Sequence, residues 1–264
     1  MRFFSATNIT AGYDKKPVIE NVSFELEPGC LMGILGANGS GKTTLLKSLC
    51  GILPHKGECI LKGNKLEELS VKELAKLCSY IPQRSGISID ISVLDVVLMG
   101  FNPQLGILQH PNCQMKDAAV QALEKVGLKG KEHVNYQHLS EGQKQLCILA
   151  RTLVAESKLL LLDEPESALD FRFRHRVLEL LDKWIADKQT SAVVTLHDPM
   201  LALNYCHKLL ILSEGKVLGF IHPFSDSLES MEKMLSHIYG EISLQYVFTK
   251  DNQRRLIMLN EDIK

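Results

Sequence analysis

The sequence has no paired cysteines, no long apolar run and almost no net charge. Its seven cysteines include no C-x-x-C pair, which argues against a zinc site and fits free thiols in a reducing compartment. No run approaches the ~20 apolar residues of a membrane-spanning helix, and the N-terminus lacks the apolar stretch of a signal peptide. The formal net charge of −1 indicates no nucleic-acid partner. We therefore expect a soluble, cytoplasmic protein that reaches a membrane only through a partner.

A glycine-rich loop stands between an expected strand and an expected helix. It reads Gly36-Ala37-Asn38-Gly39-Ser40-Gly41-Lys42-Thr43 and matches the phosphate-binding pattern G-x-x-x-x-G-K-[ST] at every fixed position. The apolar run 30–35 predicts a buried strand before it, and residues 44–50 predict a helix after it. Glycine lets the backbone approach a phosphate, and the helix N-terminus adds partial positive charge. In this pattern Lys42 reaches the β- and γ-phosphates of a nucleotide, and the Thr43 hydroxyl binds Mg²⁺.

Two carboxylates follow a second apolar run. Residues 159–162 are four leucines that predict a buried strand, and Asp163 and Glu164 come directly after it. Ligands bind at the carboxyl ends of strands in open parallel sheets. There Asp163 would hold Mg²⁺, usually through water, and Glu164 would orient and deprotonate an attacking water. The alternative is a strand that ends in an exposed acidic turn, which the preceding phosphate loop makes less favoured.

The segment Leu139-Ser140-Glu141-Gly142-Gln143 predicts the start of another helix. Ser140 and Gln143 form a capping-box pattern, and the helix is expected to run to about Ala155. A plain capping box is common and binds no ligand. The unpaired N–H groups of a helix start can also bind an anion, although one nucleotide needs only one phosphate loop. A second anion site makes sense if it faces the γ-phosphate held by another copy of the chain.

Strands and helices alternate along most of the chain. This alternation predicts an α/β fold whose parallel sheet is covered on both faces. A mainly helical stretch over about 84–155 interrupts the alternation and is interpreted as an inserted subdomain. We expect one domain over residues 1–225, which ends in a hairpin over 209–219. Residues 226–264 form an extension that alternates weakly and carries no motif.

The order of these motifs resembles the ATP-binding-cassette ATPases over about residues 3–220. The motifs are the phosphate loop, Gln83, Leu-Ser-Glu-Gly-Gln at 139–143, Leu-Leu-Asp-Glu-Pro at 161–165, Ser-Ala-Leu-Asp at 167–170 and His197. The resemblance implies a P-loop NTPase (RecA-like) parallel-sheet core with an antiparallel β subdomain and an inserted helical subdomain. It also implies ATP hydrolysis with Mg²⁺ by a homodimer whose subunits pack head to tail around two ATP molecules.

The resemblance assigns a role to three residues outside the main motifs. Tyr13 would stack on adenine, Gln83 would contact Mg²⁺ and the attacking water, and His197 would contact the γ-phosphate. Each has a plainer alternative. Tyr13 could be a core aromatic, Gln83 a solvated loop residue and His197 a capping residue at a strand end.

The matching positions form three expected sets of site residues. The catalytic set is Glu164, His197, Gln83 and Lys42. The set that binds ATP is Tyr13, Gly36, Ala37, Asn38, Gly39, Ser40, Gly41, Lys42, Thr43, Thr44, Ser140, Gly142 and Gln143. The set that binds Mg²⁺ is Thr43, Gln83 and Asp163. By the resemblance, Ser140, Gly142 and Gln143 close over the ATP of the partner, and Ser167-Ala168-Leu169-Asp170 crosses the dimer interface.

Two further stretches are similar to the ATPases of bacterial importers for iron–siderophore, haem and cobalamin. These stretches are 91–106 and 197–206. The resemblance implies an integral-membrane permease contacted near residues 83–106, and an extracytoplasmic substrate-binding protein as an indirect partner. The chain would then sit as a peripheral subunit on the cytoplasmic face of the cell membrane. The alternatives are an exporter ATPase and a soluble ATPase of the same family that moves no cargo, such as an iron–sulfur assembly factor.

Two glutamates depart from the family pattern. Glu141 stands where the family most often has glycine in the segment 139–143, which is called the signature below, and we expect its side chain to face solvent. Glu166 stands where the family often has threonine and places a charge near the dimer interface. The sequence assigns Glu166 no role.

Overall fold

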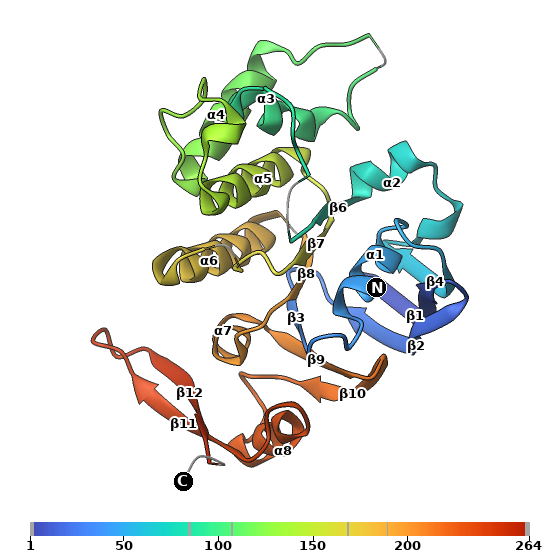
Figure 1. The fold of residues 1–264 in the computed structure, drawn as a ribbon, viewed down its shortest axis with the longest axis vertical. Coiled ribbons are helices and arrows are strands. Elements are labelled where there is room, and N and C mark those ends of the chain that lie inside the picture. Colours follow the sequence, from blue (N-terminus) through green and yellow to red (C-terminus); the bar gives the residue numbers. More distant parts are fainter. Residues whose placement is uncertain (1–2, 84–85, 107, 168, 189, 262–264) are drawn as a thin grey trace.

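A six-stranded sheet carries the core of the computed structural model, which describes residues 3–83, 86–106, 108–167, 169–188 and 190–261. The strand order is β10-β9-β3-β8-β7-β6. The strands are β3 (Leu31–Leu35), β6 (Cys78–Ile81), β7 (Leu159–Asp163), β8 (Ser191–Thr195), β9 (Lys208–Ser213) and β10 (Lys216–Ile221). All neighbours pair in parallel except β10, which runs antiparallel to β9. The predicted α/β fold with a parallel-sheet core is confirmed (Figure 1).

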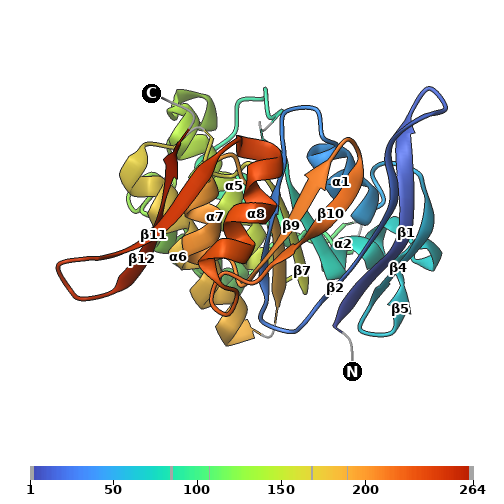
Figure 2. The ribbon, with the colours of Figure 1, turned by 90° about the horizontal axis from the view of Figure 1, so that it is seen from below.

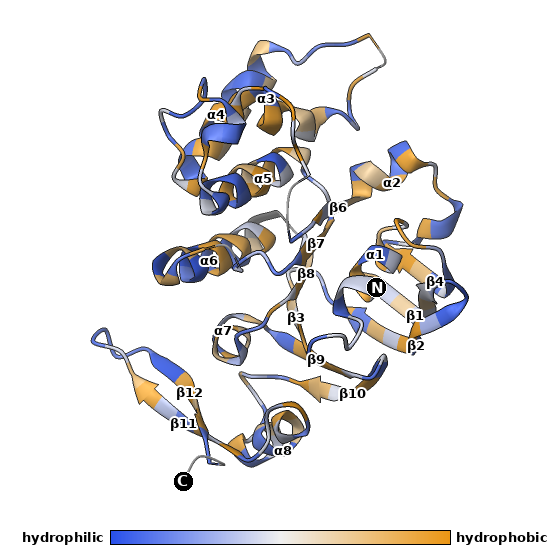
Figure 3. Ribbon diagram, viewed as in Figure 1, coloured by the Kyte–Doolittle hydropathy of each residue, from blue (hydrophilic) through white to orange (hydrophobic). Residues whose placement is uncertain are grey.

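The side chains of the central strands alternate between two apolar cores. In β7, Leu160 and Leu162 join the core that the helices build, whereas Leu159 and Leu161 join the core on the opposite face. All four side chains have no exposed surface. Because both faces are covered, a central strand of this sheet is a continuous apolar run and not an alternating one. Figure 3 colours much of these strands toward the hydrophobic end of the scale, whereas helices such as α6 carry many hydrophilic residues.

A four-stranded antiparallel sheet and one helix cover the first face. The sheet has the order β2-β1-β4-β5. Its strands are β1 (Phe4–Tyr13), β2 (Lys16–Leu26), β4 (His55–Leu61) and β5 (Asn64–Lys65), and the helix is α1 (Lys42–Leu49). The 3₁₀ turn η1 (Leu66–Glu68) and α2 (Val71–Leu77) lead from this sheet back to β6. Figure 2 shows β1, β2 and β4 on the side of the molecule that lies away from β11 and β12.

Helices α5 (Glu141–Ala155), α6 (Phe171–Lys188) and α7 (Pro199–Tyr205) cover the second face. Helices α3 (Val93–Leu98) and α4 (Cys113–Val126), with the 3₁₀ turns η2 (Met99–Phe101) and η3 (Tyr136–His138), belong to the helical region, where α3 and α4 pack on α5 and lie farther from the sheet (Figure 1). Helix α4 begins at Cys113, because the Asn112 side chain caps it by accepting a 2.9 Å hydrogen bond from the Met115 N–H. No helix in the described ranges has both the length and the apolar content needed to cross a bilayer.

The segment after β10 packs onto this second face. It forms α8 (Leu228–Tyr239), β11 (Ile242–Phe248) and β12 (Arg254–Asn260). Met231 and Leu235 of α8 are fully buried in the same core as the parallel sheet. Asn204 of α7 fastens β12, because its side chain donates to the Leu256 carbonyl and accepts from the Leu256 N–H, both at 2.9 Å. Strand β6 and helices α7 and α8 are elements that the sequence patterns did not predict.

Replacement of Leu161 by alanine should lower the free energy of unfolding by about 3 kcal/mol, because it opens a cavity in the middle of a fully buried strand. Urea unfolding followed by circular dichroism measures the change. Leu218→Ala is the matched control, since Leu218 lies in β10 of the same sheet but is 44% exposed. Equal losses for the two variants would contradict the assignment of β7 to the core.

Candidate active site

The glycine-rich loop lies between β3 and α1, as its sequence predicts. Gly41 caps α1 with a φ of 101°, and a Cβ atom there would lie 2.5 Å from the Ile19 side chain. A Cβ atom on Gly36 would lie 2.2 Å from the Leu212 carbonyl oxygen. Both positions therefore exclude any side chain. The antiparallel sheet and β9 thus hold the loop in a tight turn at the carboxyl end of β3.

The side chains of this loop suit a polyphosphate. The Lys42 side chain is buried, and its ammonium group donates to the carbonyls of Gly36 at 2.8 Å and Ala37 at 3.1 Å. Burial lowers the pKa of Lys42, and the nearby carboxylates of Glu164 and Asp163 act in the opposite direction. The buried Ser40 hydroxyl has no hydrogen-bond partner among the described residues. The Lys42 ammonium group and the unpartnered Ser40 hydroxyl lie at a turn whose glycine positions carry no side chain, and together they suit the phosphates of a nucleotide.

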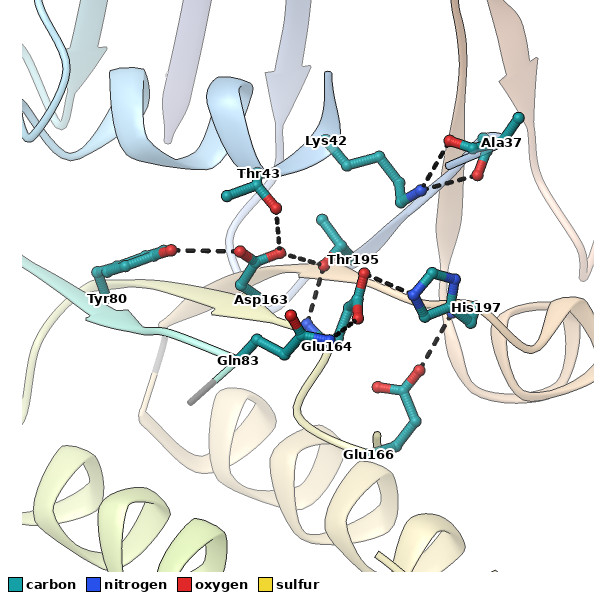
Figure 4. Close-up of polar contacts among 11 residues, drawn as sticks. Ala37, Lys42, Thr43, Tyr80, Gln83, Asp163, Glu164, Glu166, Thr195 and His197 are labelled. Atoms are coloured by element: carbon teal, nitrogen blue, oxygen red, sulfur yellow. Dashed lines mark hydrogen bonds and ion pairs between the residues drawn. The ribbon is translucent and has the colours of Figure 1, made fainter. Parts of the chain in front are cut away.

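Asp163 ends β7 and gathers three hydroxyl groups. Thr43 at the start of α1 donates to its carboxylate at 3.1 Å, Thr195 at the end of β8 at 2.8 Å, and Tyr80 of β6 at 3.3 Å (Figure 4). Asp163 and Thr195 are register partners in the parallel sheet. Carboxylate and hydroxyl oxygens are the ligands that Mg²⁺ prefers, so Asp163 and Thr43 form a suitable pair. Thr195 and Tyr80 were not predicted. Thr195 lies two residues before His197, and this closeness in the sequence is a signal that could have identified it.

The carboxylate of Glu164 contacts two of the other predicted catalytic residues. Gln83 donates its side-chain N–H to one carboxylate oxygen, and the His197 Nε2 atom lies 2.6 Å from the other. The Glu164 backbone has a positive φ of 48°, and its N–H donates to the Thr195 hydroxyl at 2.9 Å. The side chain is almost fully buried, which strengthens its polar contacts. Residues from the ends of β6, β7 and β8 therefore meet at one carboxylate (Figure 4).

Glu166 also belongs to this cluster. Its side chain is 3% exposed, and its Oε1 accepts a 3.1 Å hydrogen bond from the His197 backbone N–H. Burial raises the pKa of Glu166, and the neighbouring Glu164 acts in the same direction. The structure shows that this carboxyl group is buried within one copy of the chain, and its expected position near a dimer interface stays a prediction.

The helix signature lies on α5, in the inserted helical region. Ser140 and Gln143 form the predicted reciprocal capping box. The Glu141 side chain is 75% exposed and pairs with Lys144 at 2.9 Å, so it faces solvent as expected. Within the described residues, no hydrogen bond or ion pair joins the signature to the glycine-rich loop. The signature and the glycine-rich loop lie at the starts of different helices, α5 and α1, which Figure 1 draws apart.

Two further predicted positions stand outside this cluster. Tyr13 ends β1 and is 48% exposed, a position from which a ring can stack on a planar ligand. Its adenine contact stays a prediction. Ala168 of the Ser167-Ala168-Leu169-Asp170 segment lies outside the described residues.

A glycine-rich loop at a helix start, an acidic pair and a histidine at neighbouring strand ends define a P-loop nucleotide hydrolase. Residues 19–167 match the ABC transporter family, and the chain belongs to that family. It is an ATPase of the ATP-binding-cassette kind.

Several known proteins are similar to this chain. An iron chelatin transport ATP-binding protein of Helicobacter pylori is 35% identical over 212 residues, which are 80% of this chain and 83% of that protein. The hemin import ATP-binding protein of Vibrio parahaemolyticus is 33% identical over 245 residues, which are 91% and 92% of the two chains. A metal-chelate type ABC transporter in an inward-facing conformation matches all of both chains with a TM-score of 0.83 at 26% identity.

Lys42→Ala should weaken ATP binding about 10- to 100-fold, because it removes a charge-assisted contact to phosphate. Isothermal titration calorimetry with ATP measures the affinity. Lys47→Ala is the matched control, since Lys47 lies in the last turn of the same helix. Unchanged affinity in Lys42→Ala would contradict the assignment of the phosphate loop.

Proposed function

We propose that this chain is the ATP-hydrolysing subunit of a bacterial importer for a metal chelate, such as an iron–siderophore, haem or cobalamin. The match to a metal-chelate type transporter over the full length of both chains carries this proposal. The names of the Helicobacter and Vibrio relatives, which concern iron chelatin transport and hemin import, support the same class of cargo. In this proposal the subunit binds a membrane permease on the cytoplasmic face of the cell membrane and never touches the cargo itself.

The proposed catalytic unit is a head-to-tail homodimer. The glycine-rich loop of one copy and the signature around Ser140 of the other would enclose each ATP. The placement of the two motifs at the starts of different helices, α5 and α1, which Figure 1 draws apart, supports this arrangement. ATP would favour the closed dimer because only the bound γ-phosphate offers the signature a ligand. Residues 1–225 would form this ATPase domain with its helical subdomain at about 84–155, and residues 226–264 an extension to it.

Hydrolysis would take place at Glu164. Its carboxylate would accept a proton from the attacking water while Gln83 and His197 hold its two oxygens in place. Lys42 would offset the charge that develops on the phosphates. Thr43, Asp163 and Gln83 would hold Mg²⁺, which neutralises phosphate charge when bound. Removal of the γ-phosphate would take away the contact between the two copies and let the dimer open.

Glu164→Gln should lower ATP turnover about 100-fold or more and trap an ATP-bound dimer, because glutamine cannot accept the proton of the water. Phosphate release gives the rate, and size-exclusion chromatography in the presence of ATP gives the state of assembly. Glu68→Gln is the control, since that carboxylate is 73% exposed and lies on η1. Hydrolysis by Glu164→Gln at the wild-type rate would remove Glu164 as the base.

Affinity purification from detergent-solubilised membranes of the source cell should recover a many-spanning permease with this subunit. Ile89→Asp should reduce that recovery, because Ile89 is a 56% exposed apolar residue in the region expected to contact the permease. Leu218→Asp should not, since Leu218 lies on β10 outside that region. Mass spectrometry identifies the proteins recovered. Recovery of soluble assembly or regulatory proteins alone would contradict the importer proposal but would not affect the ATPase assignment.

A further inference from the structure

Glu166 is a buried acid for which the proposed mechanism has no use. It follows Pro165 in the loop between β7 and α6 and is 3% exposed. Its Oε1 accepts the His197 N–H at 3.1 Å, and its Oε2 has no hydrogen-bond partner within the described part of the chain. Burial of a carboxyl group that is only half satisfied is unfavourable, so a side chain that served packing alone would be better apolar.

Outside its own residue, the hydrogen bond that the described part of the chain gives the Glu166 carboxyl group comes from the backbone of His197, the histidine that contacts the proposed base. Strand β8 ends at Thr195, so the ladder of the sheet offers the His197 N–H no acceptor. Glu166 supplies that acceptor. The His197 imidazole then reaches Glu164 with its Nε2 atom at 2.6 Å. His197 is therefore fixed at two points, by Glu166 through its backbone and by Glu164 through its side chain (Figure 4).

We propose that Glu166 is a positioning residue, which ties the loop after β7 to the backbone of His197 and thereby holds the imidazole against Glu164. It acts through His197 and contacts neither the nucleotide nor the attacking water. The tie joins the loop expected at the dimer interface directly to the residue expected at the γ-phosphate. This inference rests on the roles of Glu164 and His197 in the proposed function.

The surroundings of Glu166 favour its neutral form. Among the described residues, the titratable groups that act on it are Glu164 on the same loop, His197 after β8 and Cys206 after α7. Burial is the largest effect and raises the pKa of Glu166, and the charge of Glu164 adds to it, whereas the hydrogen bonds from the backbone N–H groups of Glu166 and His197 and the charge of His197 act against it. A neutral carboxyl group still accepts the His197 N–H through its carbonyl oxygen. It does so without placing a second negative charge beside the base.

Substitutions at residue 166 test whether the hydrogen bond from the His197 N–H to Glu166 holds the imidazole in place. Glu166→Gln keeps an acceptor of the same shape and should leave kcat within about twofold of the wild type. Glu166→Leu removes the acceptor and should lower kcat about 10- to 100-fold, because the imidazole is no longer held in place. The KM for ATP should change little in both variants, since Lys42 and its loop are untouched. Steady-state phosphate release measures both constants.

Glu166→Asp provides a second variant that keeps a carboxyl group in the protein. It withdraws the acceptor by one methylene, so kcat should fall in the same direction as in Glu166→Leu. Wild-type kcat in both Glu166→Asp and Glu166→Leu would overturn the proposal. So would an equal loss in Glu166→Gln and Glu166→Leu, because the hydrogen bond would then not be what matters. Glu68→Gln serves again as the control on an exposed carboxylate.

The pH dependence of the melting temperature shows whether Glu166 acts in its neutral form or only packs against its neighbours. The contribution of a group with a raised pKa is fully present below its ordinary pKa and is lost as the pH rises through the raised value. The melting temperature of the wild type should therefore fall below that of Glu166→Gln as the pH rises. If the difference in melting temperature between the wild type and Glu166→Gln stayed constant with pH, the assignment of a neutral Glu166 would be wrong.

The rate of Glu164→Gln distinguishes failure of this inference from failure of the proposed function. Loss of turnover in Glu164→Gln together with a wild-type kcat in Glu166→Leu removes only the positioning role. Normal turnover in Glu164→Gln removes the base itself, and with it the reason for holding His197 in place.

Discussion

The parallel register of β7 against β8 is the constraint on which the site depends. It sets Asp163 opposite Thr195, so the acidic pair of Asp163 and Glu164 leaves the sheet beside the segment that carries His197. Strand β3 pairs with β8 on the other side and delivers the glycine-rich loop to the same edge. A shift of one residue would turn Asp163 to the opposite face of the sheet and break its contacts with Thr43 and Thr195. The chemistry of the site therefore follows from backbone pairing within the apolar core.

The buried strands make this register hard to change. Side chains of β7 enter two separate apolar cores, one under the helices and one under the antiparallel sheet. Each core would lose its partners if the strand moved by one position. The same burial acts on the polar groups at the strand ends. It lowers the pKa of Lys42 and raises that of Glu166, because a low-dielectric surrounding disfavours both charged forms.

The polar cluster around Glu164 links three segments that are far apart in the sequence but adjacent in the structure. Gln83 follows β6, Glu164 follows β7 and His197 follows β8. Glu166 adds a link between the last two, because it fixes the His197 backbone from the loop of Glu164. A change in that loop therefore has a direct path to the histidine. The inserted helical region carries the signature separately, which leaves the complete site to an assembly of two copies in the proposed function.

The sequence alone determined the family, the phosphate loop, the acidic pair and the capping box of Ser140 and Gln143, because these are local patterns in which neighbours along the chain set the structure. Strand β6 and the fold of residues 228–260 were not predicted, since their pairing and packing partners lie far away in the sequence. Only the tertiary structure brought Thr195 and Tyr80 to Asp163, and Glu166 to His197. Those contacts join separate strand ends, and no local pattern records which strands become neighbours in a sheet.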